Sequence, residues 1–560
     1  MFTFAKTRFT LVLLLLLLPV FATAQTKVFN VDPSYDALGR QTLEAELIRE
    51  TPNIYFYIER NWWNTLTPSE QNEIKLTLFD LGEEFRNKIY PILTSTFGSE
   101  PKPGIDKDEK ITVLLHQIRQ DAGGYSNSSD VYSRFQAPKS NEREMIYLNS
   151  LRLRSPNIKS ILAHEFMHLI TVNQKDLLRR VTEETWLNEA RAEYVPTLLG
   201  YDNSFSGSNL EKRVKDFLEN PNVSLTEWTN SKFDYAAVNL FIQYLVDHYG
   251  VKILSDSLQS SKVGIASLEE ALQKHGIKKN FHQIFSEWSV ALLLNDCRWG
   301  ESYCYFNQNL LNLRIVPTIY FLPKTETVLT TVHGTTYWAL NWHRFVGGGS
   351  NFILEFEGGN NTIAFDVPYV ICDKQNKCLV GSLVLDSQQK GKLSLVGFDQ
   401  NYNSLTIIPF IKSKTEGFDG RESNFTFSWK VSVSSKTQTD ETLRNQLLAQ
   451  ISELQEQVKQ LQLKIAEIKG TSVFSCQRIG NNLYYRMRNN QEVRCLQEFL
   501  KAQGLYPEGL ITGNFLSLTQ AAVIRFQEKY ALEILAPLGL TKGTGFVGST
   551  TRAKINQLIK

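Results

Sequence analysis

The period of hydrophobic and polar positions changes several times along the chain, and each period predicts a different kind of element. In the first half, strand-like apolar runs at residues 54–58 and 111–115 alternate with long amphipathic helical stretches. Further along, short alternating segments such as residues 352–356 are separated by Gly, Asn and Asp turns. The pattern predicts an α+β domain over residues 25–312 and a β-sandwich domain over residues 313–434.

A heptad-like repeat follows the predicted sandwich, within residues 435–470. Its apolar residues are spaced alternately by four and three: Leu447, Ile451, Leu454, Val458, Leu461, Ile465 and Ile468. β-Branched residues at one seam position and mostly Leu at the other favour a parallel two-stranded coiled coil. We therefore predict a coiled-coil linker, with a homodimer through it as the matching assembly. A single spacer helix is the alternative, because the repeat is short.

The start of the chain carries a targeting pattern. Lys6 and Arg8 precede an apolar run over residues 11–20, and residues 22–24 have the small-x-small spacing of a cleavage site. We predict a signal peptide over residues 1–24. The mature protein is then secreted or cell-wall associated, in the extracellular or periplasmic space of a bacterium. An uncleaved anchor is the alternative, although the apolar run is shorter than the roughly 20 residues that a bilayer span needs.

Charge and cysteine content limit the classes of function. Sixty basic and 58 acidic residues leave a formal charge of +2, so no global field recruits nucleic acid or an anionic membrane. Spacing along the chain predicts three local disulfides: Cys297 with Cys304, Cys372 with Cys378, and Cys476 with Cys495. An oxidising compartment suits them, although six cysteines permit about 15 pairings. No pair has C-x-x-C spacing, so we expect no thiolate metal site.

The most informative motif lies in one predicted helix. Ser155-Pro156 is typical of a helix start, and His164, Glu165 and His168 follow as H-E-x-x-H within an amphipathic pattern. Histidines four residues apart project from one face of a helix, so both imidazoles can bind one metal ion. Glu165 points about 100° away around the helix, beside the metal. From there it can act as a base toward a water molecule on the metal.

A hydrolytic zinc site needs three protein ligands and one open position, so a third ligand is expected downstream. Glu189 is the strongest candidate, in a W-L-N-E segment whose pattern also suits a helix. Glu193 lies one turn further, where a carboxylate can accept a hydrogen bond from a ligand histidine. The alternatives are glutamates on a solvated face and core histidines on an amphipathic helix.

The H-E-x-x-H motif, followed by W-L-N-E-x-x-A-E-Y over residues 186–194, resembles the gluzincin pattern of thermolysin-like and aminopeptidase families. It resembles the hyicolysin-type metallopeptidases more closely, through Gly123-Gly124-Tyr125 and residues 140–148. This resemblance covers about residues 40–290 and implies a zincin-like catalytic domain with one catalytic Zn²⁺. The roles it implies are metal binding by His164, His168 and Glu189, and general-base catalysis by Glu165.

Three further residues or segments have weaker signals. Gluzincins commonly steady the oxyanion with a Tyr or His, and Tyr235 is the best local candidate, with a core or capping role as the alternative. His248 is expected at a helix end rather than in catalysis. Residues 106–109 offer carboxylates for calcium, but a hydrophilic turn before the next strand is favoured. The G-x-M-E-N segment typical of aminopeptidase relatives is absent, which favours endopeptidase action.

The last part of the chain, residues 471–560, is predicted to be a small α-helical module with helices over 492–503 and 518–530. Its sequence from Val493 to Gln527 resembles the peptidoglycan-binding helical repeat, with an insertion at residues 534–543 as the main departure. The resemblance implies peptidoglycan as a partner. A protein-docking module is the alternative, because the apolar positions are explained as core residues.

These observations predict a multidomain, secreted zinc metalloendopeptidase that hydrolyses peptide bonds with a Glu-activated, zinc-bound water. Its C-terminal module would tether it to the cell wall. We expect a protein or peptide substrate, no nucleic-acid partner, and no membrane contact after signal cleavage. Two alternatives stay open: a non-catalytic cell-wall-binding scaffold, and a hydrolase of peptidoglycan crosslinks.

Overall fold

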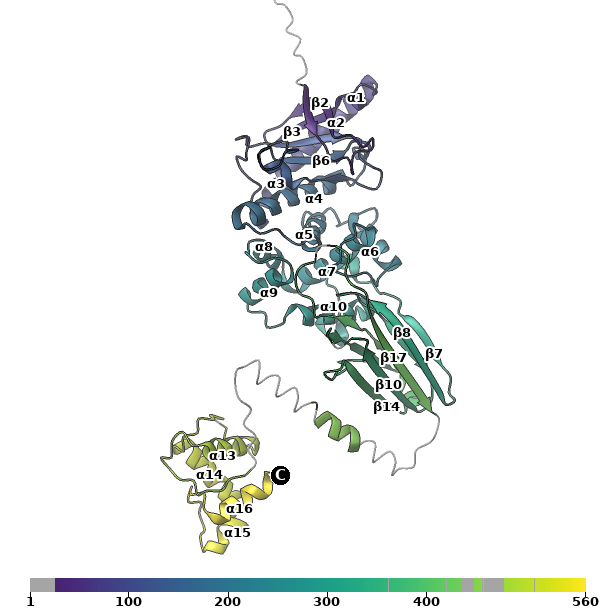
Figure 1. Ribbon diagram of the computed structural model, residues 1–560. Helices are drawn as coiled ribbons and strands as arrows, with labels where there is room; N and C mark the ends of the chain where they lie inside the picture. Colours follow the sequence, from purple (N-terminus) through teal and green to yellow (C-terminus); the bar gives the residue numbers. More distant parts are fainter. Residues whose placement is uncertain are drawn as a thin grey trace, which may run out of the picture. The chain divides into compact units, whose positions relative to one another are not determined.

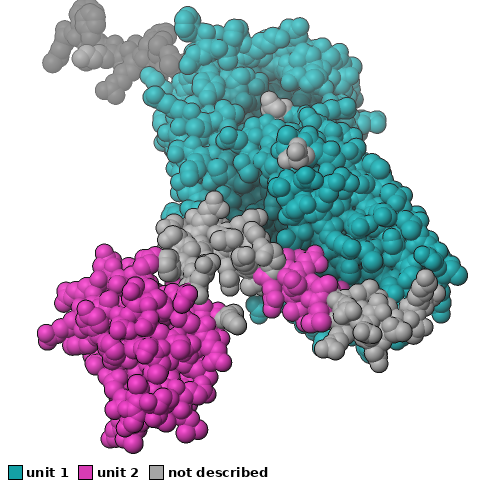
Figure 2. All heavy atoms as spheres, turned by 60° about the horizontal axis from the view of Figure 1, so that its bottom comes forward, with its two compact units in different colours: residues 1–437 teal, residues 438–560 magenta. Residues whose placement is uncertain are grey.

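The computed structural model describes residues 26–360, 362–418, 420–434, 448–455, 457, 478–507 and 509–559. The predicted signal peptide and most of the predicted coiled coil lie outside these ranges. The chain divides into two compact units, Met1–Thr437 and Gln438–Lys560, which Figure 2 distinguishes by colour. No described helix is both long and apolar enough for a membrane span.

The first part of unit one alternates strands and helices (Figure 1). Its strands are β1 (Thr26–Asn30), β2 (Thr42–Glu50), β3 (Ile54–Glu59), β4 (Ile111–His116), β5 (Gly124–Tyr125) and β6 (Met145–Asn149). Its helices are α1 (Arg60–Trp63), α2 (Pro68–Glu84), α3 (Tyr90–Phe97), α4 (Ile158–Thr171), α5 (Thr185–Leu198), α6 (Asn209–Glu219), α7 (Lys232–Tyr249), α8 (Lys252–Leu258), α9 (Gly264–Lys274) and α10 (Phe281–Leu294).

These strands form one mixed sheet of order β1-β2-β3-β4-β6-β5. The central strands β3, β4 and β6 run parallel, and β5 pairs antiparallel with β6 at the edge. Every residue of β4 and β6 is buried, as expected for strands covered on both faces. The sheet and the helices after it confirm the predicted α+β character.

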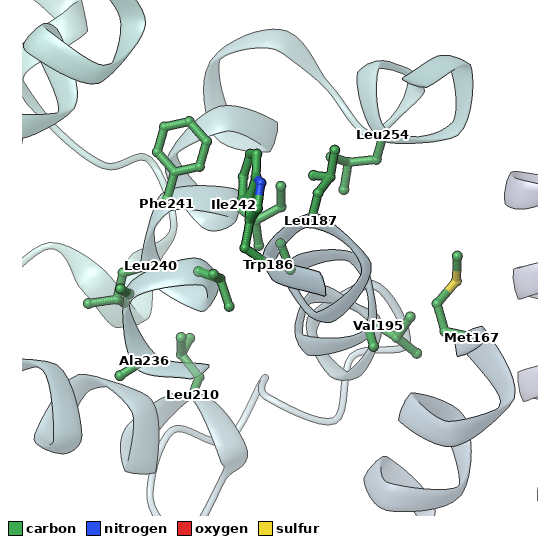
Figure 3. Packing of buried hydrophobic residues seen from close by; sticks show 14 of the residues in the cluster. Met167, Trp186, Leu187, Val195, Leu210, Ala236, Leu240, Phe241, Ile242 and Leu254 are labelled. Carbon is green, nitrogen blue, oxygen red and sulfur yellow. The ribbon is translucent and has the colours of Figure 1, made fainter. Parts of the chain in front are cut away.

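Helix α4 follows β6 and packs against α5, which in turn packs against α7. Trp186 and Leu187 of α5 are fully buried and share one apolar cluster with Leu240 and Phe241 of α7 (Figure 3). α4 begins at Ile158, later than the Ser155-Pro156 start that the sequence predicts. The hydroxyl of Ser155 instead accepts the N–H of Asn157, which closes a turn ahead of the helix.

The second part of unit one is a β-sandwich, as predicted. Its elements are β7 (Thr318–Leu322), β8 (Thr327–Thr335), β9 (His343–Gly347), β10 (Asn351–Gly358), β11 (Phe365–Asp366), β12 (Pro368–Asp373), β13 (Cys378–Ser382), β14 (Lys390–Val396), α11 (Phe398–Asn401), β15 (Tyr402–Ile407), β16 (Phe410–Ile411) and β17 (Phe425–Ser434). A four-stranded sheet, β14-β10-β17-β8, faces a five-stranded sheet, β13-β12-β15-β9-β7. Residues of both sheets form a common apolar core.

The sandwich also shares a core with the helices. Trp338 and Phe410 belong to the large cluster that contains α10, and Phe285 of α10 meets both rings at 5.2 and 4.9 Å. Glu184, which precedes α5, accepts hydrogen bonds from the backbone N–H groups of Gly417 and Phe418. The two parts of unit one are therefore packed together through apolar and polar contacts.

Two of the three predicted disulfides are confirmed, Cys297–Cys304 and Cys372–Cys378. The third predicted pair includes Cys476, which lies outside the described residues. Residues 448–455 and 457 of the predicted linker are helical, and Ile451 and Leu454 on its predicted seam are about half exposed. The coiled coil and the homodimer remain predictions.

Unit two contains α13 (Gln491–Ala502), α14 (Ser517–Lys529), α15 (Ala531–Ile534) and α16 (Ser549–Leu558). Its first two helices confirm the predicted pair. The buried Gln497 of α13 and Gln527 of α14 hold equivalent loops, each donating to a backbone carbonyl and a threonine hydroxyl and accepting two backbone N–H groups. The hydroxyls are those of Thr519 and Thr551, and the N–H groups those of Thr512, Gly513, Thr544 and Gly545. The module thus contains one structural unit twice.

Candidate metal centre

The structure brings the two motif histidines and Glu189 together. The Nε2 atoms of His164 and His168 are 3.2 Å apart. The Oε2 atom of Glu189 lies 3.3 Å from Nε2 of His164 and 3.6 Å from Nε2 of His168. The histidines come from α4 and the carboxylate from the neighbouring α5. Among the described residues, these three form the one group of three or more His, Cys, Asp and Glu side chains that is compact enough to hold a metal ion.

The size of this triangle fits a zinc ion. Zinc–nitrogen and zinc–oxygen bonds of about 2.0–2.1 Å in a tetrahedron place neighbouring ligand atoms roughly 3.3–3.4 Å apart. The observed separations of 3.2–3.6 Å bracket that value. In addition, Oε2 of Glu189 is buried and has no hydrogen-bond partner. A buried carboxylate oxygen without a partner is costly, and a cation at the centre of the triangle would satisfy it.

The charges in this cluster favour a positive charge at its centre. Burial opposes ionisation of Glu189, but the two imidazoles outweigh it and hold the pKa of the carboxyl far below its usual range. Burial likewise opposes protonation of His168, but the Glu189 carboxylate outweighs it and raises the pKa of this imidazole to about 9. A bound divalent cation would supply the same positive charge without protons.

Each motif histidine has an oxygen beside its second ring nitrogen. The Oδ1 atom of Asn188 lies 3.1 Å from Nδ1 of His168, so the Nδ1–H donates and leaves Nε2 free for a metal. The Oε1 atom of Glu193 lies 3.6 Å from Nδ1 of His164. Glu193 itself forms a bidentate pair with Arg213 at 2.6 and 2.8 Å. Glu193 thus lies near His164 at a distance longer than a hydrogen bond, and its strongest bonds go to Arg213.

Glu165 lies beside the triangle rather than in it. The side chain is 6% exposed, and burial raises the pKa of its carboxyl. The edge strand β5 approaches it closely, because a Cβ atom on Gly124 would lie 3.1 Å from Glu165 Oε1 and 2.7 Å from the carbonyl oxygen of Tyr147. Only glycine leaves room here, so the strand backbone and the carboxylate face the same cleft. That cleft has a volume of about 580 Å³ and is lined by both groups and by the triad.

Two tyrosines border the cleft, and both contact Asn230. The hydroxyl of Tyr235 on α7 donates to Oδ1 of Asn230 at 3.0 Å. Tyr35, from the loop between β1 and β2, is also hydrogen-bonded to Asn230 and stacks on Tyr125 of β5 at 4.6 Å. Burial raises the pKa of both hydroxyls, and Glu165 and Glu189 raise both further. Both tyrosines therefore stay protonated and can donate.

A buried ionic cluster fixes the start of α5. Glu183 forms ion pairs with Arg191 at 2.7 Å and with Lys175 at 3.4 Å. Lys175 lies in the π-helical turn that continues α4, so the cluster ties the helix of the histidines to the helix of Glu189. Lys175 and Arg191 also bond to Ser257 of α8. These contacts set the relative position of the two helices that supply the triad.

Sequence reasoning missed several residues of the site. Asn188 stood inside the W-L-N-E motif without an assigned role, whereas Tyr35, Asn230 and Arg213 lie in segments without a recognisable pattern. Two weaker predictions are placed as follows. His248 lies in the last turn of α7 and bonds to the carbonyl oxygen of Cys304. The carboxylates of Asp106 and Asp108 each accept a backbone N–H two residues on, as in turns.

Comparison with known proteins agrees with the site. The chain is 31% identical over 242 residues to the neutral metalloprotease ShpI of Staphylococcus hyicus. The match covers 38% of this chain and 52% of that protein, so the chain spans about half the length of the relative. This similarity confirms the resemblance to hyicolysin-type metallopeptidases.

The C-terminal unit and the solved structures give two further results. Residues 489–534 match the family described as a peptidoglycan binding domain, which confirms the second resemblance. The lysozyme inhibitor PliG of Aeromonas hydrophila shares 12% identity, covers 21% of this chain and 100% of its own, and has a TM-score of 0.15. The mitogen of Yersinia pseudotuberculosis shares 9% identity, covers 20% and 92%, and has a TM-score of 0.15. Scores this low carry no conclusion.

Proposed function

We propose that this chain is an exported, zinc-dependent metalloendopeptidase held at the cell wall by its C-terminal unit. The observation that carries the proposal is the triangle of His164, His168 and Glu189, whose ligand atoms lie 3.2–3.6 Å apart around a buried carboxylate oxygen without a partner. The similarity to a neutral metalloprotease supports the same reading. Both observations support a zincin-like catalytic domain, which is part of the proposal.

The triad would hold one zinc ion, with two imidazoles and one carboxylate as ligands. When bound, zinc supplies Lewis acidity, which lowers the pKa of water and polarises a carbonyl group. Asn188 keeps His168 in the tautomer that presents Nε2 to the cation. With these three protein ligands, a bound zinc ion would keep one position for water or substrate, as hydrolytic zinc sites do.

Glu165 would carry the proton. Its carboxylate is buried beside the triad, and among the described residues no hydrogen bond engages it. It can therefore accept the proton of the attacking water and deliver it to the leaving amide nitrogen. Tyr235 and Tyr35 border the same cleft with protonated hydroxyls, and we assign to Tyr235 the role of donor to the oxyanion.

The edge strand gives a reason for cleavage within a chain. β5 pairs with β6 on one side and has no strand partner on the other among the described strands. Its backbone lines the cleft next to Glu165, where an extended peptide can add as a further strand through main-chain hydrogen bonds. This mode recognises peptide backbone without an anchor for a free terminus, which favours an endopeptidase.

The match of residues 489–534 to a peptidoglycan binding domain supports attachment to the wall. It also favours a second candidate, cleavage of the peptide crosslinks of peptidoglycan by the same site. The third candidate is a non-catalytic scaffold. The intact Glu165 next to the triad argues against it.

Metal analysis and two substrates separate these candidates. We expect the purified full chain to contain one zinc per molecule, and to digest casein until a zinc chelator is added. A protein without zinc and without activity on casein or purified sacculi would support the scaffold. Activity on sacculi alone would support the crosslink hydrolase. Co-sedimentation of the chain with sacculi, and its loss on removal of residues 471–560, tests the wall attachment.

A further inference from the structure

The β-sandwich contains a pair of histidines that the proposed peptidase site does not use. His333 lies on β8 and His343 on β9, so one comes from each sheet of the sandwich. Their ring centres are only 4.2 Å apart, with an angle of 45° between the planes. Two imidazoles from opposite sheets therefore meet inside the sandwich, close to its edge strands β8 and β7 (Figure 1).

Polar atoms without partners gather at this pair. The Nε2 atoms of both His333 and His343 are buried without a hydrogen-bond partner, and so is Nε1 of Trp429. The indole ring centre lies 6.0 Å from each imidazole ring centre. Buried polar groups in folded proteins are nearly always satisfied, so three such atoms in one cluster point to a ligand.

The state of the imidazoles suits metal binding. The Nδ1 atom of His343 lies 3.2 Å from the hydroxyl oxygen of Tyr320 on β7. When Nδ1–H donates to this oxygen, Nε2 presents its lone pair to the cluster, as in metal sites where a neighbour fixes the tautomer. Burial lowers the pKa of both histidines, that of His343 to about 3 with a further contribution from His333. Both rings are therefore neutral near pH 7.

The surroundings select the kind of metal. Tyr320, Phe427 and Trp429 pack around the pair, and no Asp or Glu of the described residues contributes to the pKa shift of either imidazole. Hard ions such as calcium and magnesium bind oxygen ligands, so they do not fit. Zinc in structural sites takes four protein ligands, and two imidazoles fall short of that set. Among divalent first-row ions, copper binds nitrogen ligands most tightly.

We propose that His333 and His343 form a copper-binding site in the β-sandwich, separate from the triad on α4 and α5. The ring centres lie 4.2 Å apart and both Nε2 atoms lack partners, so one ion can be shared by the two imidazoles. The N–H of Trp429 cannot bind a metal, but it can donate to a water or anion that completes the coordination. His333 is partly exposed on the edge strand β8, which gives the ion a way in.

The test uses the zinc-loaded full chain, copper sulfate and elemental analysis after removal of unbound metal. We expect wild type to take up one copper ion per chain while its zinc content stays the same. His333→Gln should bind copper at least about tenfold more weakly, with peptidase activity unchanged. The electron paramagnetic resonance spectrum of bound Cu²⁺ should show splitting from imidazole nitrogen in wild type.

Three further variants make the result specific. His275→Gln removes an exposed imidazole that pairs with Asp256, and it should leave copper uptake unchanged. Trp429→Phe should reduce the quenching of tryptophan fluorescence by copper, because this indole ring centre lies 6.0 Å from each of the two imidazole ring centres. His343→Phe changes the other proposed copper ligand, at a buried position. If this variant does not fold, the result for His333→Gln alone tests the proposal. Equal copper uptake by wild type and His333→Gln, or uptake that displaces zinc from the triad, overturns the proposal.

Discussion

The Nδ1–H of His168 donates to Oδ1 of Asn188 across 3.1 Å, and Asn188 immediately precedes Glu189 in the chain. One turn of α5 therefore both orients a histidine of α4 and supplies the carboxylate that faces the same centre. Any shift of α5 relative to α4 would disturb two ligands at once.

We expect Asn188→Ala to weaken zinc binding by about 10- to 100-fold, because His168 loses the partner that fixes its tautomer. Glu189→Ala deletes one of the three proposed zinc ligands, so the purified variant should contain no bound zinc. Competition with a chromogenic chelator measures both affinities. Asn220→Ala, at the exposed end of α6, is the matched control. Unchanged affinity in Asn188→Ala would contradict the orienting role.

Glu165→Gln should reduce kcat on casein by about 10²- to 10⁴-fold, because the amide cannot accept the proton. Zinc content and thermal stability should stay close to wild type, since the shape is preserved. Glu109→Gln changes a carboxylate whose side chain is 74% exposed and serves as the control. Retained cleavage in Glu165→Gln would remove the proposed mechanism.

Substitutions of the two tyrosines should change different kinetic constants. Tyr235→Phe should lower kcat by about 10²-fold with little change in KM, as expected for loss of one oxyanion donor. Tyr35→Phe should mainly raise KM, because Tyr35 stacks on Tyr125 of the edge strand that we propose to bind substrate. Steady-state kinetics on a fluorogenic peptide distinguishes them. The reverse pattern would assign the oxyanion role to Tyr35.

His116 should make the stability of unit one depend on pH. This fully buried ring has Nδ1 3.2 Å from Asp36 and Nε2 3.3 Å from the hydroxyl of Tyr125. Burial outweighs the attraction of Asp36 and lowers the pKa of His116 from 6.5 to about 4. The folded chain thus binds this proton less tightly than the unfolded chain does. The contribution of neutral His116 to the free energy of unfolding is complete above pH 6.5. It declines by roughly 2–3 kcal/mol as the pH falls toward 4.

Urea unfolding between pH 7.5 and pH 4 measures this contribution. Other carboxyl groups titrate in the same range, so the comparison is with His116→Gln, which should show a shallower loss of stability on acidification. His275→Gln, which changes an imidazole paired with Asp256 at the surface, should keep the wild-type slope. Identical slopes for His116→Gln and wild type would refute the assignment.

Gln497→Leu and Gln527→Leu should each destabilise unit two by about 2–4 kcal/mol. Either change leaves two backbone N–H groups and a carbonyl without partners inside the module. Thermal unfolding of the full chain should show the transition of this unit shifted downward while peptidase activity on casein stays the same. Gln491→Leu, at the exposed start of α13, should have no comparable effect.

Periodic elements were predictable from the sequence, and partners between distant segments were not. H-E-x-x-H and W-L-N-E each lie on an amphipathic helix, so spacing alone placed His164, His168 and Glu189 on facing surfaces. Tyr35 lies far ahead of the motif and reaches the cleft only because the loop between β1 and β2 stacks on β5. No local pattern encodes such a contact.

Where the sequence predictions were less accurate, a competing hydrogen-bond partner explains the difference. Ser155-Pro156 has the pattern of a helix start, but the Ser155 hydroxyl caps a turn and the helix begins at Ile158. Glu193 was predicted to accept a hydrogen bond from a metal-binding histidine, and its Oε1 atom lies 3.6 Å from Nδ1 of His164. Its bidentate partner Arg213 comes from α6, and nothing in the sequence indicated that this arginine turns inward.

Phe285 packs against Trp338 and Phe410, and Glu184 is hydrogen-bonded to Gly417 and Phe418. These contacts decide where the chain can be truncated for expression. The composition of the chain invites a border near residue 312. A fragment ending there would expose an aromatic face of α10 and leave the carboxylate before α5 without its backbone donors. For expression trials, the smallest piece that keeps the histidine helix properly supported runs to the end of β17.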